Sequence, residues 1–248
     1  MSTPLITWKY ASPQHFYPLA GKLIPWFVAL TLIFGAWGLW LGLLVAPTDA
    51  QQGEGYRIIF VHVAASWMSM FLYVVMAFWA GVGLGFNTRL SSMMASAIAP
   101  TGAMFAFLSL WTGALWGKPM WGTWWVWDAR LTSELILFFL YLGFIALQAA
   151  IDDPRRADKA GAILALVGVI NVPIIYFSVM WWNTLHQGAS VSLTKAPSMA
   201  RTMLLGMLLV ALCFWMYSIV MTLLRVRAIM LERERHTEWV ANLKEVRP

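Results

Sequence analysis

Six long apolar runs constrain the fold of this chain more than any other feature. They span roughly residues 24–45, 58–83, 94–115, 131–151, 161–181 and 203–224. A helix rises about 1.5 Å per residue, and about 20 apolar residues cross the hydrocarbon core of a membrane. Each run is long enough for this. The sequence therefore predicts an all-α integral membrane protein with six transmembrane helices.

Composition supports this class and leaves no room for a separate soluble domain. The chain of 248 residues is 60% hydrophobic and only 11% charged, whereas soluble domains are about a quarter charged. We expect a single membrane domain over 1–248. The net charge of +6 does not indicate nucleic-acid binding, because the basic residues form no single stripe. The lone Cys213 lies in an apolar run and predicts neither a disulfide nor a thiolate metal site.

Lys and Arg residues divide unevenly between the two ends of the predicted spans. Five of the 17 basic residues fall at one end: Arg57, Lys118, Arg130, Lys195 and Arg201. The other twelve fall at the end that carries both termini. Because cytoplasmic connections carry the excess of Lys and Arg, both termini are expected in the cytoplasm. The first, third and fifth connections then face outward, and a solvated helical tail over 225–248 is cytoplasmic.

The third connection is unusually rich in tryptophan. If residues 121–128 were helical, four side chains would share one face through i, i+3, i+4 and i+7 spacing. Such an amphipathic segment would lie flat on the membrane and present an aromatic platform to a flat apolar ligand. The alternative is plain anchoring, because indoles gather at membrane interfaces. The stretch WGKPMWGTWWVWDARLTSE (116–134) holds Trp116, Trp121, Trp124, Trp125 and Trp127.

Two of the four histidines fall at the same outer level as the tryptophans. His62 lies about one turn into the second span, in YRIIFVHVAASW, and His186 follows the fifth span, in WWNTLHQGAS. An ionisable side chain within a span is a functional hypothesis by default, although a single histidine is more often a hydrogen-bonded residue at a helix end. His15 and His236 fall in the predicted cytoplasmic tails, where we expect them to be solvated. Two histidines and five indoles at one depth favour a binding site.

Two imidazoles beside an aromatic surface favour haem over a bare metal ion. Structural zinc takes four protein ligands and catalytic zinc usually three, and copper favours Cys, Met or a further His. Haem iron needs only one or two axial ligands, often imidazole. Its propionates need cations, for which Arg57 and Arg130 are the outward candidates, because a guanidinium binds a carboxylate through two hydrogen bonds. Lys118 is interpreted as a headgroup contact.

Two acidic residues flank the start of the fourth span. Asp128 is expected to pair with Arg130 or to orient an indole N–H. Glu134, with Thr132 and Ser133, is expected to supply first-turn chemistry at a helix N-terminus. A structural role is preferred for both acids. The sequence holds no phosphate loop, nucleophile elbow or pair of catalytic carboxylates, so we expect no enzyme activity, and any energy must come from a partner.

The same stretches resemble a known family. WGTWWVWDARLT (121–132) is similar to the WGxWWxWDxRLT signature, the WWD motif, of haem-handling membrane proteins. With YRIIFVHV before it and WWNTLHQG after it, nearly the whole chain resembles the CcmC family of cytochrome c maturation proteins. The resemblance implies that an outward loop forms a platform for a transiently bound b-type haem and that two outer histidines ligate its iron. By position, the ligands are His62 and His186, and the platform with its neighbours is Trp116, Trp121, Trp124, Trp125, Trp127, Asp128 and Arg130.

The resemblance also implies partners and a place in the cell. Members of the family load haem onto the membrane-anchored periplasmic chaperone CcmE, at the periplasmic face of the bacterial inner membrane. They work with the small single-span subunit CcmD and with CcmA and CcmB, the ATPase and permease subunits of an ABC transporter. ATP hydrolysis then releases the loaded chaperone. The missing phosphate loop in this chain agrees with that division of labour.

Two other functions stay open at the level of the sequence. A secondary transporter that moves haem or another aromatic solute would need polar or charged residues near the midplane of the membrane, and Asn171 is the best candidate. A structural subunit would use its tryptophans only to anchor itself or to dock a partner helix. That second alternative predicts a colourless purified protein.

Overall fold

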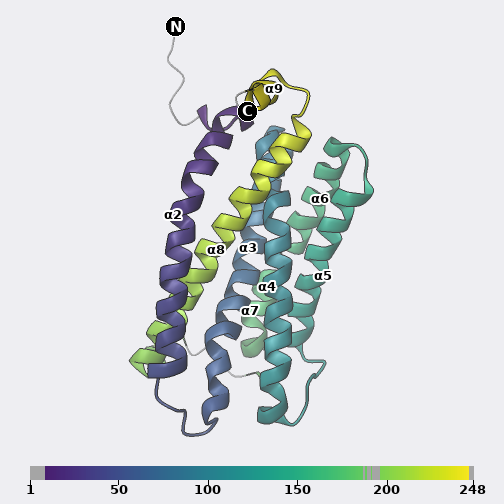
Figure 1. Cartoon of the computed structure of the whole chain (residues 1–248). Coiled ribbons are helices and arrows are strands. Elements are labelled where there is room, and N and C mark those ends of the chain that lie inside the picture. Colours follow the sequence, from purple (N-terminus) through teal and green to yellow (C-terminus); the bar gives the residue numbers. More distant parts are fainter. Residues whose placement is uncertain (1–8, 187, 189–190, 192–195, 246–248) are drawn as a thin grey trace.

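The chain folds into long helices packed side by side (Figure 1). This computed structural model describes residues 9–186, 188, 191 and 196–245. Six segments of them are long and apolar enough to cross a membrane, which confirms the predicted six-span, all-α architecture. Segments of 33 residues reach about 50 Å and extend beyond a hydrocarbon core of about 30 Å. The six are Pro13–Val45, Glu54–Phe86, Arg89–Trp121, Ala129–Ala150, Pro154–Trp181 and Arg201–Arg233.

Local sequence sets where these helices begin and end. The fifth span is built from two helices, with Pro173 in the first turn of the second, where its missing N–H has no intrahelical partner to lose. In chain order the elements are α2 (Pro13–Trp40), the π-helical turn η1 (Leu41–Val45), the 3-10 turn η2 (Glu54–Ile58), α3 (Ile59–Phe86), α4 (Arg89–Trp121), α5 (Ala129–Ala150), α6 (Pro154–Gly168), α7 (Asn171–Trp181), α8 (Arg201–Arg233) and α9 (Glu238–Glu245).

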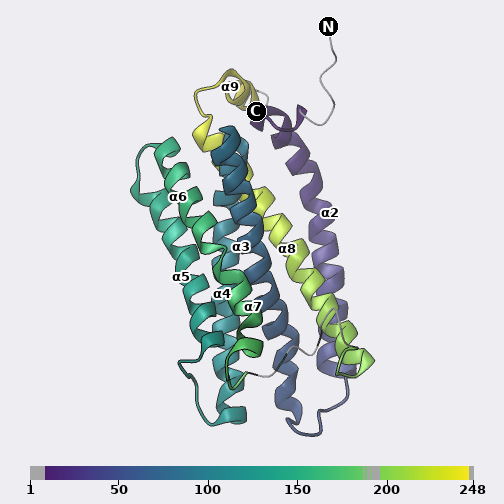
Figure 2. The same ribbon diagram turned by 180° about the vertical axis from the view of Figure 1, so that it is seen from behind.

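The helices form a bundle with α3 and α4 at its centre. α3 packs mainly against α4, and α2 mainly against α8, which also contacts both central helices. α5 lies against α4, α6 and α7. Figures 1 and 2 show α2 and α8 on one side of the bundle and α5, α6 and α7 on the other. The main core cluster lies between, with Tyr73, Phe105 and Tyr141 fully enclosed.

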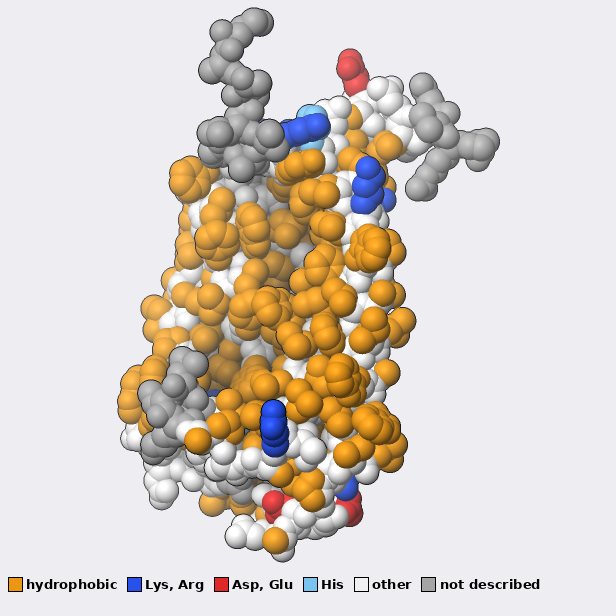
Figure 3. All heavy atoms as spheres, turned by 90° about the vertical axis from the view of Figure 1, so that its left-hand side faces the viewer, with side chains coloured by type: hydrophobic (Ala, Val, Ile, Leu, Met, Phe, Trp, Pro, Cys, Tyr) orange, Lys and Arg blue, Asp and Glu red, His pale blue; other side chains and the backbone are white. Residues whose placement is uncertain are grey.

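The flank of the bundle is apolar and its ends are polar. Figure 3 shows hydrophobic side chains over the middle of the α2 side, with charged side chains towards the two ends. On α2 the exposed fraction is 73% for Trp26 and 67% for Leu32. Such exposure suits a surface solvated by lipid tails. In Figure 1 the start of α2 and α9 lie at one end, and the connection between α4 and α5 lies at the other.

Glycines bring η1, the start of α3 and α8 into close contact at one end of the bundle. A Cβ atom on Gly42 would lie 2.7 Å from the Phe60 ring, and one on Gly206 would lie 3.1 Å from the Gly42 backbone nitrogen. The Phe60 ring fills the space that these two glycines leave and is fully buried. Small residues allow membrane helices to approach at this distance. The first turn of α3 is therefore held between η1 and α8.

The chain beyond Arg225 differs from the predicted solvated tail. α8 continues as far as Arg233, and Val226 and Met230 are fully buried against α4 and its neighbours. Arg233 donates to both Asp158 carboxylate oxygens, at 2.8 and 3.0 Å. This packing could not be predicted from the sequence, because charged residues lie on both sides of these apolar residues in the chain. The C-terminal part of α8 is thus part of the bundle.

Candidate functional site

The tryptophan stretch begins inside a helix and continues as a loop. α4 runs through Trp116 as far as Trp121 and ends at Gly122, whose φ of 74° lies in the left-handed region. The Gly122 N–H donates to the Lys118 carbonyl at 3.1 Å. The rest of the stretch up to α5 is irregular. The conditional helix over 121–128 is therefore wrong, because this glycine ends α4 just after the first residue of that range.

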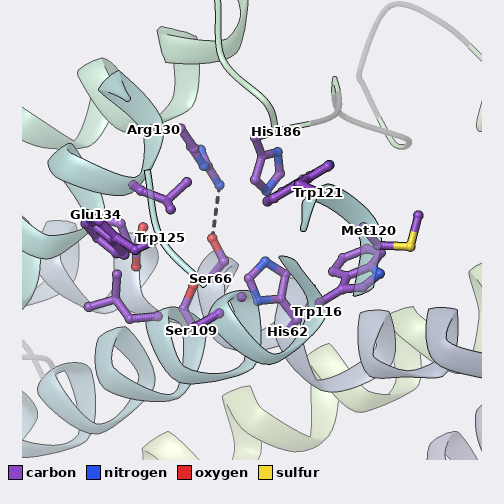
Figure 4. A pocket seen from close by; sticks show the side chains of 14 residues that line it. His62, Ser66, Ser109, Trp116, Met120, Trp121, Trp125, Arg130, Glu134 and His186 are labelled. Carbon is purple, nitrogen blue, oxygen red and sulfur yellow. Dashed lines mark hydrogen bonds between the residues drawn. The ribbon is translucent and has the colours of Figure 1, made fainter. Parts of the chain in front are cut away.

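The two predicted histidines line one pocket at the end of the bundle that carries the connection between α4 and α5. Its empty volume is about 650 Å³, which includes open solvent at its mouth. Figure 4 shows His62 and His186 on facing sides of this space. Their ring centroids lie 6.2 Å apart, and the ring planes meet at 34°. The pocket also contains Trp116, Trp121, Trp125, Arg130, Glu134, Ser66, Ser109 and Met120.

His62 is fixed in the first turn of α3. Only 7% of it is exposed, and its Nδ1 lies 3.0 Å from the Thr112 hydroxyl oxygen on α4. That hydroxyl donates its only proton to the Leu108 carbonyl at 2.6 Å, so it accepts from Nδ1–H of the imidazole. The Nε2 atom of His62 consequently carries the lone pair. This is the arrangement in which a second hydrogen bond orients a metal-ligating histidine.

His186 lies on the connection after α7, opposite His62. Its ring centroid is 6.2 Å from that of Trp121, with the planes tilted by 54°. Trp116 meets His62 edge-on at 5.6 Å. Each histidine therefore has one indole of α4 beside it. Among the described residues, no group of three or more His, Cys, Asp and Glu side chains is placed to hold a bare metal ion.

The five tryptophans separate into two sets. Trp116, Trp121 and Trp125 line the pocket. Trp124 and Trp127 do not line it, and their exposed fractions are 54% and 77%. The three lining indoles lie around the pocket that holds both histidines, whereas the other two are exposed outside it. Five indoles were expected to form one platform, and three of them line the pocket.

The two predicted arginines also separate. Arg130 lines the pocket and donates to the Ile175 carbonyl at 2.7 Å and to the Ser66 hydroxyl at 3.1 Å. Arg57 does not line the pocket. It pairs with Glu54 and donates to the carbonyls of Gly42 and Ala46 at the end of the first span. Its guanidinium satisfies carbonyl groups that η1 leaves without helical partners.

The two acidic residues at the start of α5 have different roles. Asp128 is the N-cap of α5 and accepts from the Leu131 N–H at 2.8 Å, as the preferred structural interpretation predicted. The first-turn role of Glu134 is wrong. α5 begins at Ala129, so Glu134 lies in its second turn, where it is only 4% exposed and lines the pocket.

Sequence reasoning also missed polar residues on the inner side of the pocket. Ser66 and Ser109 lie on α3 and α4, and Ser66 follows His62 by one turn. The spacing of His62 and Ser66 at i and i+4 was a usable signal. Two residues that line the pocket each have a buried atom with no hydrogen-bond partner among the described residues, Trp125 Nε1 and Glu134 Oε2. Such groups are uncommon in folded proteins and need a reason.

Comparisons with known proteins agree along the length of the chain. A family model described as Heme exporter protein C matches residues 6–241. A Haemophilus influenzae protein named Heme exporter protein C is 48% identical over 242 residues, covering 96% of this chain and 98% of that protein. An Escherichia coli protein of the same name is 46% identical, covering 95% of both chains. A Marchantia polymorpha protein named as a putative cytochrome c biosynthesis ccmC-like mitochondrial protein is 46% identical, over 79% of this chain and 83% of that one. The chain belongs to the heme exporter protein C family.

Proposed function

We propose that this protein binds haem at the outer end of its helix bundle and hands it to a periplasmic haem chaperone for cytochrome c maturation. One observation carries the proposal. His62 and His186 face each other across a pocket whose walls include Trp116, Trp121 and Trp125. The names of the relatives, Heme exporter protein C and a cytochrome c biosynthesis protein, support the same cargo and the same process.

The separation of the two imidazoles fits a shared iron. An imidazole nitrogen binds a transition metal at about 2.0–2.1 Å, so two in-line imidazoles on one ion have ring centres roughly 6 Å apart. The observed separation of the centroids is 6.2 Å. The porphyrin supplies the other four ligands, so two histidines complete the coordination of the iron. No third protein ligand is required.

The surrounding residues hold the ligands and the flat ring. Thr112 accepts from His62 Nδ1–H and thereby leaves Nε2 as the nitrogen that would hold the iron. The indoles of Trp116 and Trp121 restrict the imidazoles from the side and offer apolar faces to the porphyrin. Arg130 lies inside the same pocket and supplies a positive charge for a propionate.

The placement in the cell follows from charge and from the family. The excess of Lys and Arg at the end that carries both termini favours a cytoplasmic location for that end, which puts the pocket at the periplasmic face of the inner membrane. We propose CcmE as the receiving chaperone, CcmD as a small subunit, and CcmA and CcmB as the ATPase and permease of the complex. The protein itself binds and transfers haem without catalysing a reaction.

Haem transport through the bundle is the alternative, and the residue that favoured it has a structural role. Asn171, the midplane candidate, donates to the Ser133 carbonyl at 2.9 Å and is buried. Its side chain joins the start of α7 to α5. A pocket at the end of the bundle supports binding and transfer better than permeation.

Absorption spectra test the proposal. The purified protein should show a Soret band, and the reduced form should show the sharp visible bands of six-coordinate haem. The His62→Ala/His186→Ala double variant should insert and fold but lose or shift these bands, and it should not load the chaperone. His15→Ala/His236→Ala is the matched control, because neither residue lines the pocket. A wild-type protein that stays colourless with added haem, or a double variant that loads the chaperone normally, would refute the proposal.

A further inference from the structure

A second cavity lies next to the histidine pocket and shares one wall with it. Its empty volume is about 820 Å³, which includes open solvent. His62 lines only the histidine pocket and Gln52 only the second cavity, whereas Trp116 lines both. Among the residues that the structure describes, no other lines both spaces. Figure 4 shows Trp116 beside His62. The Trp116 indole is therefore the partition between the two cavities.

A single hydrogen bond holds this indole from the side of the second cavity. Trp116 Nε1 lies 2.9 Å from Gln52 Oε1, and the two residues are 64 positions apart in the chain. An indole N–H can only donate, so the amide oxygen of Gln52 accepts. The same indole meets the His62 ring edge-on, with the centroids 5.6 Å apart. The bond from Gln52 thus fixes the orientation of a ring that contacts the proposed iron ligand.

The connection between η1 and η2 presents Gln52 by its own backbone bonds. Asp49 Oδ1 accepts from the backbone N–H groups of Gln51 and Gln52 at 2.9 and 2.8 Å. The Gly53 N–H donates to the Asp49 carbonyl at 3.0 Å, and the Gly53 φ of 57° lies in the left-handed region. An aspartate that binds the backbone two and three residues later stabilises a tight turn. The side chain of Gln52 can therefore be replaced while the turn stays in place.

The second cavity offers space into which the indole can turn. Met203 and Met207 on α8 line it. Methionine side chains are unbranched and adapt their shape to a neighbour. Without the bond from Gln52, the Trp116 indole can rotate towards these thioethers. The histidine pocket would then open into the second cavity.

We propose that Gln52 is a positioning residue that holds Trp116 as a closed partition beside His62 and thereby slows the release of haem. This inference rests on the proposed function, because haem is the retained ligand. Gln52 does not line the histidine pocket, so it acts through Trp116. Breaking the bond between Gln52 and Trp116 opens a path for haem through the second cavity.

The rate of haem release tests the role of Gln52. Haem-loaded protein in detergent is mixed with excess apomyoglobin, and transfer is followed at the Soret band. Gln52→Leu removes the acceptor and should speed release by roughly twofold to tenfold, the factor that one neutral hydrogen bond supplies. Gln52→Glu keeps an acceptor oxygen and should release haem at nearly the wild-type rate. Gln51→Leu is the matched control, because it makes the same change one residue earlier in the same cavity.

A double-mutant cycle tests whether Gln52 acts through Trp116. Trp116→Phe removes the indole N–H, so it should speed release by itself. Adding Gln52→Leu to Trp116→Phe should then have no further effect. If Gln52→Leu speeds release equally with Trp116 and with Phe at that position, Gln52 acts by another route and the inference is refuted.

Hydrogen exchange of the indole N–H gives a readout that needs no haem. In protein labelled with ¹⁵N at its indoles, the Trp116 signal is identified by its loss in Trp116→Phe. Its exchange with D₂O should be faster in Gln52→Leu and unchanged in Gln51→Leu. An unchanged rate in Gln52→Leu would show that this bond does not hold the indole.

The two readouts separate this inference from the proposed function. Faster exchange with an unchanged rate of haem release would refute the inference and leave the haem site standing. If the wild-type protein takes up no haem, the proposed function fails and the retention of haem fails with it. The exchange rates would still show whether Gln52 holds Trp116. Faster exchange together with faster release, both restored in Gln52→Glu, supports the inference.

Discussion

Removing the hydroxyl of Thr112 tests how the protein orients its proposed iron ligand. Thr112→Val is nearly isosteric, but it leaves His62 Nδ1–H without the acceptor that lies 3.0 Å away. Because His62 is only 7% exposed, water cannot easily replace that partner. The imidazole then either rotates or keeps an unpaired donor, and in both cases Nε2 becomes a poorer ligand.

The size of the effect follows from the contacts of the ring. Loss of such an outer hydrogen-bond partner costs about 10–100-fold in metal affinity. We expect haem affinity to fall by at least about tenfold, which is about 1.4 kcal/mol. Thr112→Ser restores an acceptor and should recover most of the affinity.

The assay is a haem titration followed at the Soret band, with thermal unfolding as a check on folding. Thr31→Val is the matched control, because the Thr31 hydroxyl also donates to the carbonyl four residues earlier, at 2.7 Å, but lies on α2 away from the pocket. The control should bind haem normally. Wild-type affinity and spectrum in Thr112→Val would show that this hydroxyl does not orient the ligand.

Three further substitutions separate binding from stability. Gly113→Ala places a Cβ atom 3.0 Å from His62 Cε1, so it should weaken haem binding in a titration, while thermal stability holds because alanine favours helix by up to about 1 kcal/mol. Asp128→Ala removes the N-cap of α5 and should cost about 1 kcal/mol, seen as a lower unfolding temperature that Asp128→Asn largely restores. Arg57→Gln frees the carbonyls at the end of the first span and should lower the unfolding temperature, yet reduce haem affinity less than Arg130→Gln does. If Arg57→Gln and Arg130→Gln reduced haem affinity equally, Arg57 would have to be counted among the binding residues.

The apolar runs predicted the six spans because the length of an apolar segment is a direct requirement of the bilayer. Successive spans run in opposite directions through the membrane. Counting the spans was therefore enough to place His62, His186 and the tryptophan stretch at the same end of the bundle. The structure places both histidines in one pocket, at the end predicted from topology.

Details that depend on helix ends or on distant contacts could not be predicted. Trp116 was assigned to a loop, but α4 continues to Trp121. It ends at Gly122, which adopts the left-handed conformation. Glu134 was assigned to a first turn, but the cap at Asp128 puts it one turn further, facing α3. Arg57 donates to carbonyls up to 15 residues away in the chain. No local sequence pattern predicts such a contact.

The contact of Gly42, Phe60 and Gly206 has a mechanical consequence for the position of His62. Phe60 is wedged between Gly42 and Gly206, and His62 follows it by two residues on the same turn of α3. A shift of α8 along α2 would push on the Phe60 ring, and because that ring has no free space, the whole turn would tilt and carry the imidazole with it. α8 extends to the opposite end of the bundle, where Arg233 is tied to Asp158. α8 therefore connects the end of the bundle that holds Arg233 and Asp158 to the turn of α3 that carries His62.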